Sequence, residues 1–366
     1  MGVSTTFVER TPFEIRRGDL TGAIGDTITT LPLLVALALL TPISLPHVLI
    51  AFGVFQIVWG GWYGLPISVE PMKALAALAI AGGLSYAELS LAGIVLGALL
   101  LAIGLTGTLG VVERWIGEPV VRGVQLAVAL LLFETAIDLA VVDVTMAAVG
   151  VFVAAVVVVV GYRRSSAIAV LLVGVAIAIA SAGIGQPAWP GAPPTPSLTG
   201  SLSWRTADGV FAQLAMTIGN AALATSLLVS DLFDRRVTPD RLSTSMGVTN
   251  LLAVPAGGIP MCHGCDGLAG KYAFGARTGG ANMVLGVGYI ALAVIATGAM
   301  IAAFPLAMLG VLLVIVAYSL GKHVLQSSNL PLSVGMGIVA LLTNIGIAFL
   351  AGVLVHLALK RTTDRQ

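Results

Sequence analysis

Charge is the property that this sequence has least of. Only 10% of its 366 residues are charged, whereas 58% are hydrophobic and the mean hydropathy is +1.03. This composition excludes an ordinary soluble domain. The formal net charge of +1 gives no reason to expect nucleic acid as a partner. Cysteine is scarce as well: the two cysteines, Cys262 and Cys265, lie too close in sequence to provide a disulfide framework.

Long apolar runs fill the chain instead. Leu91–Leu109, Val144–Val160 and Ala167–Ala182 approach or reach the ~20 residues that a membrane-spanning helix needs. The strands of an outer-membrane barrel would alternate polar and apolar residues, which these runs do not. Met1–Arg17 is polar and basic, so we expect no cleavable signal peptide. The sequence therefore predicts an all-α polytopic protein embedded in the lipid bilayer of the plasma (inner) membrane.

One apolar segment, residues 65–78, is interrupted by two prolines and two charges. Pro66 and Pro71 cannot donate backbone hydrogen bonds, and Pro71 suits the first turn of a helix. We therefore expect extended chain up to about Glu70, followed by a half-length helix over residues 70–82. Interrupted hydrophobic segments are a sequence indicator of a transporter's binding site.

A second interrupted segment follows the first at an interval of 194 residues, which separates Pro66 from Pro260. It predicts another half-helix, over residues 266–276. The same interval sets two acids of the first half opposite two amides of the second, Asp19 opposite Gln213 and Asp26 opposite Asn220. An interval shared over about fifty residues predicts an internal duplication.

The apolar pattern predicts fourteen segments in two sets of seven. The first set lies near residues 20–40, 46–64, 70–82, 88–109, 119–140, 144–162 and 166–184. The second set lies near residues 209–229, 243–258, 266–276, 281–302, 305–321 and 331–359, and the last of these ranges holds either one long helix or two short ones. We expect residues 1–184 and 209–366 to form inverted repeats, joined by a proline-rich connector over residues 185–208.

The basic residues test this count. With fourteen segments and a cytoplasmic N-terminus, sixteen of the 18 Lys and Arg residues, Lys271 among them, fall on the cytoplasmic side. The exceptions are Arg205, in the connector, and Lys73, which we expect to be the only cation deep in the core. This asymmetry satisfies the positive-inside rule, puts both termini in the cytoplasm and favours two short final helices. An odd number of segments inverts the second repeat, so the N-termini of the half-helices should meet near the midplane.

Two helix N-termini that face one cavity form an anion site, because each carries unpaired N–H groups and a partial positive charge. Gly264, Gly267 and Gly270 would let an anion approach the backbone closely, or would simply pack helices tightly. Lys73 either contacts the ligand directly or neutralises Glu70, three residues earlier.

Other polar residues have two open roles each. Asp19 and Asp26 lie two turns apart on one face of the first helix. An acid within the membrane is a candidate proton carrier, although Asp19 at the helix end could simply be solvated. The eighth segment carries a polar stripe that either lines the cavity or holds helices together, formed by Gln213, Thr217 and Asn220.

The run from Cys262 to Asp266 is a weak candidate for a metal or redox site. A structural zinc site needs four ligands, and the sequence holds no second Cys/His cluster, so we expect no metal and no cofactor. His263 either lines the cavity or packs in the core.

Three signature segments carry a resemblance to a known family. They are Val69-Glu70-Pro71-Met72-Lys73, Arg122-Gly123-Val124-Gln125-Leu126, and Cys262-His263-Gly264 with Gly267-Leu268-Ala269-Gly270 and Phe274-Gly275-Ala276-Arg277. These segments resemble the molybdate transporter family of plants and prokaryotes, which is related to the sulfate permeases and the nucleobase transporters. The chain departs from the expected pattern where Glu70 replaces a glutamine and where Cys265 and Asp266 replace Ala-Gly.

The resemblance implies a 7+7 inverted-repeat fold with two moving parts. A core domain would comprise segments 1–4 and 8–11, near residues 18–110 and 209–302. It would move against a gate domain of segments 5–7 and 12–14, near residues 118–184 and 304–360. An oxyanion would bind between the third and tenth segments. The expected substrate contacts are Val69, Glu70, Pro71, Met72, Lys73, Gln213, Thr217, Asn220, Cys262, His263, Gly264, Asp266 and Gly267.

We therefore predict a secondary active transporter that imports a tetrahedral oxyanion, molybdate or sulfate, by an elevator or rocking motion. Inward movement of a dianion opposes an inside-negative potential by about 2.3 kcal/mol per charge per 100 mV, so we expect cotransport of protons or other cations, with protons favoured. Glu70, Asp26 and Asp19 are the candidate proton carriers. An anion channel or uniporter is the alternative. A nucleobase-type transporter, or an intramembrane enzyme using His263 with Asp266 and Cys262, has less support. A homodimer is one candidate assembly.

Overall fold

The computed structural model describes residues 15–196 and 198–363. Most of the polar N-terminal lead, with Arg10, and the C-terminal Arg365 lie outside these ranges. Within them the chain is mostly helical, and eight helical stretches are long and apolar enough to cross a membrane. The protein is a polytopic membrane protein, as its composition predicts.

The first half of the chain contains six of the longer helices, and local signals mark several of their ends. A capping box of Ser85 and Glu88 begins α4, and Gly64 and Gly107 end α2 and α4 in the left-handed region. A short helix, α5, joins α4 to α6 and was not predicted. The helices are α1 (Arg17–Leu40), α2 (Leu45–Tyr63), α4 (Tyr86–Thr106), α5 (Leu109–Ile116), α6 (Glu118–Ala140), α7 (Val144–Val159) and α8 (Ser166–Ala182), with 3-10 turns η1 (Val141–Asp143) and η2 (Arg163–Ser165).

The second half begins with one continuous helical rod and ends with two separate helices. In the rod, α9 (Trp204–Met216) passes through a π-helical stretch, η3 (Thr217–Ala224), into α10 (Thr225–Phe233). The final apolar stretch is divided, as the charge pattern favours. The other elements are α11 (Pro239–Ala253), α13 (Gly280–Ile295), α14 (Gly298–Ala302), α15 (Leu306–Gly321), η4 (Lys322–Gln326), α16 (Leu330–Leu342) and α17 (Ile345–Thr363).

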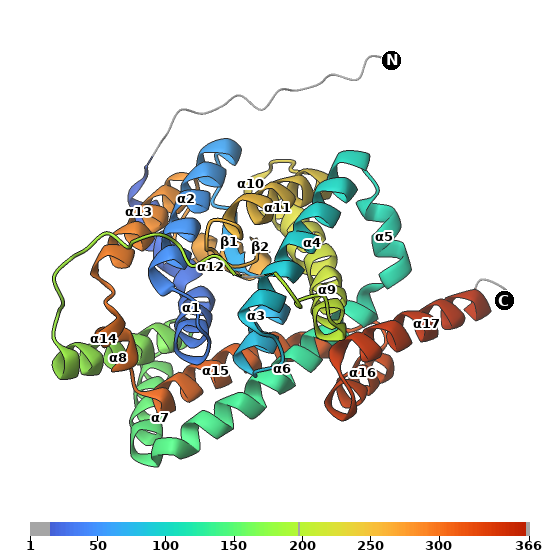
Figure 1. The fold of residues 1–366 in the computed structure, drawn as a ribbon. Coiled ribbons are helices and arrows are strands. Elements are labelled where there is room, and N and C mark those ends of the chain that lie inside the picture. The colour runs from blue at the N-terminus through green and yellow to red at the C-terminus, as the bar shows by residue number, and fades with distance from the viewer. Residues whose placement is uncertain (1–14, 197, 364–366) are drawn as a thin grey trace.

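Two short strands correct the all-α prediction. β1 (Ser68–Pro71) leads into the short helix α3 (Lys73–Ile80), and β2 (Met261–Gly264) leads into α12 (Cys265–Ala273). The strands pair antiparallel, with Val69 opposite His263, amid the surrounding helices (Figure 1). Extended backbone at membrane depth needs internal partners, and each strand supplies them to the other. The first half-helix consequently begins at Lys73 rather than at residue 70.

Helices of the two halves pack in exchanged pairs. α2 packs against α13 and α4 against α11, while α1 packs against α12 and α3 against α9. Val69 and His263, which face each other in the strand ladder, are also separated by the 194-residue interval found in the sequence. A local two-fold axis through the strand pair would produce both features.

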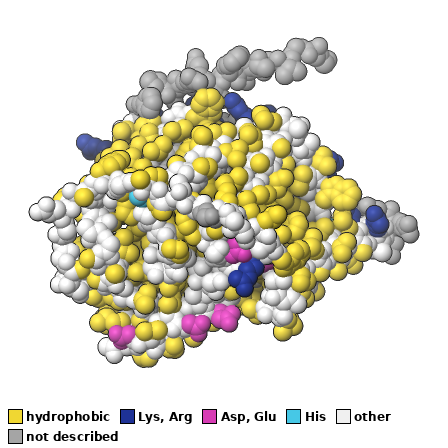
Figure 2. Space-filling model, viewed as in Figure 1, with side chains coloured by type: hydrophobic (Ala, Val, Ile, Leu, Met, Phe, Trp, Pro, Cys, Tyr) yellow, Lys and Arg dark blue, Asp and Glu magenta, His cyan; other side chains and the backbone are white. Residues whose placement is uncertain are grey.

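Six further helices occupy one side of the molecule in Figure 1. α6, α7, α8, α15, α16 and α17 lie along the lower side of Figure 1, away from the strand pair. The side of the molecule that faces the viewer in Figure 2 carries many hydrophobic side chains and few charged ones. Such a surface is suited to contact with lipid. On α7, Phe152 and Val159 are 68% and 86% exposed, as expected for side chains that contact acyl chains.

Candidate functional site

The N-termini of α3 and α12 lie next to each other because their leading strands pair. We call the region formed by residues 68–73 and 261–267 the strand–helix junction. At α3, the backbone N–H groups of Ala74 and Leu75 donate to Gln213 Oε1, over 2.9 Å and 3.4 Å. The amide of Gln213 donates in turn to Thr217 Oγ1 over 2.9 Å. Gln213 of α9, bonded to Thr217 of η3, therefore satisfies two of the free N–H groups of this half-helix.

At α12, the partner of the free N–H groups is a carboxylate from the other half-helix segment. The backbone N–H of Gly267 donates to Glu70 Oε1 over 2.7 Å, and Glu70 is completely buried. Glycine is required here, because a Cβ on Gly267 would lie 2.2 Å from Glu70 Oε1 and one on Gly264 would lie 2.0 Å from the Glu70 carboxyl carbon. These two glycines thus allow close approach of a carboxylate to the backbone, beyond any role in helix packing.

Lys73 lies between two carboxylates. Its Nζ is 2.9 Å from Glu70 Oε2 and 2.9 Å from Asp266 Oδ2. The Lys73 side chain is only 5% exposed, whereas that of Asp266 is 23% exposed. Asp266 Oδ1 also lies 4.0 Å from His323 Nε2 on η4. The junction therefore holds two acids for one buried base, and it reaches solvent on the side of Asp266.

Ser68 adds an unsatisfied group to the junction. Its Oγ is buried and has no hydrogen-bond partner among the described residues. The same atom lies 2.5 Å from the position that a Cβ on Gly267 would take, so it points at the N-terminus of α12. Sequence reasoning missed Ser68, although it directly precedes the signature segment that begins at Val69.

A second buried ion cluster lies beside the junction and corrects one prediction. Lys271 Nζ is 3.0 Å from Asp26 Oδ2, and both side chains are 0% exposed. Lys271 also donates to Gln56 Oε1 over 3.1 Å and to Asn282 Oδ1 over 2.7 Å, while Gln56 donates to Asp26 Oδ2 over 2.7 Å. The assignment of Lys271 to the cytoplasmic side, and of Lys73 as the only deep cation, was therefore wrong.

One sequence signal could have found this cluster. Lys271 falls inside the predicted half-helix 266–276, five residues from Asp266. It should have been placed at membrane depth with that helix, where an unpaired ammonium is too costly to persist. Its partner Asp26 was already a candidate on the first helix.

Asp19 lies elsewhere and is fully engaged. It is completely buried, and its oxygens accept from the backbone N–H groups of Arg16, Arg277 and Thr278 over 2.9, 2.9 and 3.2 Å. The Thr278 hydroxyl donates to it over 2.6 Å. The solvated alternative for Asp19 is therefore wrong. Its carboxylate fastens the loop after α12 to the start of α1.

His263, on β2 within the junction, packs in the core. Its ring is 2% exposed, with Nε2 2.7 Å from Ser245 Oγ and Nδ1 3.0 Å from the Ser68 carbonyl oxygen. Trp59 and Tyr63 meet the ring edge to face. Both ring nitrogens have partners, so the geometry favours the packing role over contact with a ligand.

The other predicted residues at this place are buried or nearly so. Cys265 Sγ donates to Asn220 Oδ1 over 3.0 Å, and Cys262 Sγ lies 3.8 Å from the Pro71 carbonyl oxygen. Val69 and Met72 are 1% exposed. Within residues 15–196 and 198–363, no group of three or more His, Cys, Asp or Glu side chains is arranged to hold a metal ion.

Asn250 is a positioning residue that sequence reasoning missed. Its side chain accepts from the backbone N–H of Met261 over 2.8 Å and donates to the carbonyl oxygen of the same residue over 2.7 Å. It thereby fixes the start of β2 from α11.

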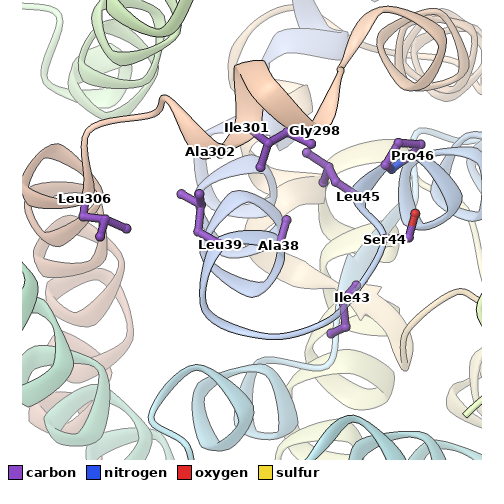
Figure 3. A pocket seen from close by; sticks show the side chains of 10 residues that line it. All are labelled: Ala38, Leu39, Ile43, Ser44, Leu45, Pro46, Gly298, Ile301, Ala302 and Leu306. Carbon is purple, nitrogen blue, oxygen red and sulfur yellow. The ribbon is translucent and has the colours of Figure 1, made fainter. Parts of the chain in front are cut away.

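A separate cavity of ≈ 560 Å³ lies away from the junction (Figure 3). Its walls are mainly apolar side chains, with the Ser44 hydroxyl, from the end of α1, the loop that follows it, the start of α2, α14 and the start of α15. Among the described residues that line it there is no charged side chain and no predicted substrate contact. The lining residues are Ala38, Leu39, Ile43, Ser44, Leu45, Pro46, Gly298, Ile301, Ala302 and Leu306.

The two parts of the chain that form the strand–helix junction match a known protein family. Residues 18–132 and 205–320 match the family described as "Molybdate transporter of MFS superfamily". The chain belongs to this molybdate transporter family. All three signature segments, including the junction, fall within the matched residues. Membership in a transporter family also settles the enzyme alternative: the protein is not an enzyme.

Relatives of this family member span most of its length. It is 27% identical to Molybdate transporter 1 of Arabidopsis thaliana, over 95% of this chain and 89% of the relative. It is 28% identical to Molybdate transporter 2 of the same plant, over 94% and 88%.

Two solved structures share the fold. The transmembrane domain of the cyanobacterial bicarbonate transporter BicA is 15% identical, with a TM-score of 0.68 over 92% of this chain and 97% of that one. The murine anion transporter Slc26a9 in the inward-facing state is 14% identical, with a TM-score of 0.70 over 96% and 70%. These likenesses establish the architecture of the family member.

Proposed function

We propose that this protein is a secondary active transporter that imports a tetrahedral oxyanion, molybdate or sulfate, coupled to protons. The relatives named molybdate transporters support the substrate class. The observation that carries the proposal is the strand–helix junction, where two helix N-termini and the Lys73 ammonium converge in a buried place. Backbone N–H groups, helix dipoles and a buried cation together suit an anion.

The junction offers donors of three kinds to a tetrahedral oxyanion. Gly267 supplies a backbone N–H, Lys73 an ammonium group and Ser68 a hydroxyl that has no partner in the described part of the chain. Hydrogen bonds from charged donors to anions are short and strong, and several donors around one centre match an ion with four oxygens. Molybdate and sulfate share shape and charge, so the same donors serve either.

We further propose fourteen segments in two inverted repeats, over residues 1–184 and 209–366, with the connector between them. The exchanged packing of α2 on α13 and α4 on α11 supports this arrangement. The core domain would contain α1–α4 and α9–α13, with the junction at its centre. The gate domain would contain α6–α8 and α15–α17. The transport motion is then a displacement of the core along the gate, as in an elevator.

The exposed edge of the junction suggests which way this conformation opens. Asp266 is its most exposed charged side chain and faces His323 on the gate. Lys322 and Arg122 lie nearby on the gate, and the positive-inside rule assigns both to the cytoplasmic side. We therefore propose that the conformation faces inward and that both termini are cytoplasmic.

A binding panel on the purified protein tests the substrate class. The proposal predicts saturable binding of molybdate, tungstate or sulfate, weaker binding of phosphate and none of uracil. Uracil binding without oxyanion binding would favour the nucleobase-type transporter and contradict the proposal.

A flux assay in proteoliposomes separates the transporter from its main alternative. Uptake by a secondary active transporter saturates with substrate and accelerates when the outside is acidified. An anion channel or uniporter would conduct down the anion gradient alone and ignore an imposed proton gradient.

A further inference from the structure

The carboxylate of Glu70 stands where an oxygen of the substrate would be expected. We propose that Glu70 is a tethered competitor of the oxyanion: it fills the subsite formed by Gly267 N–H, the Ser68 hydroxyl and the Lys73 ammonium, and it leaves this subsite as a neutral acid when the oxyanion binds. This inference rests on the proposed function and specifies how substrate and proton are linked.

The contacts of Glu70 are those of a bound anion. One oxygen accepts from Gly267 N–H at the N-terminus of α12, and the other meets Lys73 Nζ at the N-terminus of α3. The carboxylate thus engages both half-helices, and both of its contacts are groups expected to bind substrate. A second anion cannot use the Gly267 N–H until Glu70 releases it.

Ser68 distinguishes this arrangement from permanent capping of α12. A buried hydroxyl without a partner costs free energy, so a junction built only to bind Glu70 would use this group or lack it. The Ser68 Oγ points at the same helix N-terminus and is left over when the two-oxygen carboxylate is bound. An oxyanion with four oxygens can accept from Gly267, Lys73 and Ser68 together.

The charges around Glu70 require that one negative charge of the junction be neutralised when a dianion binds. The charged and titratable groups that face it come from five elements, namely Asp26 on α1, Lys73 on α3, Cys262 on β2, Cys265, Asp266 and Lys271 on α12, and Tyr289 on α13. Lys271 is already balanced by Asp26. A dianion beside both Glu70 and Asp266 would then face only one ammonium, and like charges in a low dielectric repel strongly.

Protonation of Glu70 removes one of these charges without breaking any covalent bond. A proton taken up from the solution adds to a carboxylate oxygen, which then releases the Gly267 N–H and the Lys73 ammonium to the oxyanion. Release of the oxyanion reverses the exchange, and Glu70 returns the proton as it reoccupies the subsite. One proton therefore travels with each oxyanion through this residue.

Proton uptake by the wild-type protein tests the exchange directly. Molybdate is added to purified protein in a weakly buffered solution, and the pH change is followed with an indicator. We expect about one proton taken up per molybdate bound, and an apparent affinity that weakens by up to about tenfold per unit rise in pH.

The variant Glu70→Gln removes the competitor's charge and its proton. We expect it to bind molybdate with no proton uptake, with an affinity that no longer changes with pH and equals or exceeds that of the wild type at neutral pH. Glu134→Gln is the matched control, because Glu134 is an exposed carboxylate on α6. It should keep both the proton uptake and the pH dependence of the wild type.

Two results would overturn the inference alone. One is wild-type binding of molybdate with no proton uptake, which decides the matter even if the Glu70 variant does not fold. The other is an unexpected result with a folded Glu70→Gln variant. Either its affinity for molybdate keeps the pH dependence of the wild type, or at low pH it binds molybdate more than about tenfold more weakly than the wild type does, a loss of about 1.4 kcal/mol. Failure of the wild type to bind any oxyanion would instead overturn the proposed function, and this inference with it.

Discussion

The two buried ion clusters of this protein lie next to each other but differ in charge balance and in how completely their hydrogen bonds are satisfied. The Asp26–Lys271 pair is balanced, fully buried and surrounded by amides that complete its hydrogen bonds. At the strand–helix junction, Glu70 and Asp266 share one ammonium, one acid is partly exposed and a hydroxyl is left without a partner.

This contrast indicates a structural role for the Asp26–Lys271 cluster and a binding role for the strand–helix junction. A balanced, satisfied cluster gains nothing from a ligand or a proton, so it serves to fix α1, α2, α12 and α13 to one another. An unbalanced cluster with an unused donor changes its energy when an anion or a proton binds. Variants that break each cluster should therefore show different defects.

The largest effect is expected from breaking the balanced pair. Lys271→Ala or Asp26→Asn leaves one buried charge without its partner, which typically costs about 3–5 kcal/mol. The pairing with Lys271 thus gives Asp26, a candidate proton carrier in the sequence, a structural role. The measurement is the apparent melting temperature of the purified protein. The exposed Asp138→Asn on α6 serves as control, and wild-type stability in both core variants would refute the structural role.

Closing the junction sterically should abolish binding. In Gly267→Ala the new methyl group would lie 2.2 Å from Glu70 Oε1 and 2.3 Å from Asp26 Oδ1, within the space that the oxyanion needs. We expect molybdate binding by calorimetry to fall below detection. Gly335→Ala is the matched control, because a Cβ there meets nothing within 4 Å. Wild-type affinity in Gly267→Ala would place the substrate elsewhere.

Removing the junction's cation should weaken binding without abolishing it. Lys73→Ala loses a charged donor, which corresponds to about 1.5–3 kcal/mol, or roughly tenfold to a hundredfold in affinity. Unlike Gly267→Ala, this change also leaves two acids unpaired, so the double variant with Glu70→Gln is needed. If the double variant recovers full affinity, Lys73 only balances charge; if it stays weak, Lys73 contacts the oxyanion.

The smallest effect should come from the unused hydroxyl. Ser68→Ala removes a group that has no hydrogen-bond partner within residues 15–196 and 198–363, so stability should not fall. If the hydroxyl donates to the oxyanion, affinity should drop about twofold to tenfold. Ser90→Ala is a suitable control, because Ser90 is equally buried but bonded within α4. A loss of stability with unchanged affinity would contradict the role given to Ser68.

The sequence predicted the architecture better than it predicted the site. Hydrophobic runs and prolines located every long helix and both interrupted segments, because the bilayer imposes length and apolarity on each span. The pairing of residues 68–71 with residues 261–264 escaped prediction. It depends on two segments far apart in sequence satisfying each other's backbone, and no local pattern encodes such a contact.

Side-chain partners were harder still to predict. Glu70, Lys73 and Asp266 were all singled out, yet the second ion pair was missed because Lys271 was assigned by a rule about loops. The roles of Ser68 and Gln56 follow only from three-dimensional placement, since serine and glutamine carry no charge signal in an apolar sequence. Charge patterns therefore locate such a site, and geometry identifies its donors.

The most direct test is a structure of the protein with tungstate, whose heavy atom is visible against the chain. The account predicts tungstate density at the strand–helix junction, with oxygens within hydrogen-bond distance of Gly267 N and Lys73 Nζ, and with the Glu70 carboxylate displaced from both. Tungstate bound outside the junction, or bound there with Glu70 still on the Gly267 N–H, would contradict it.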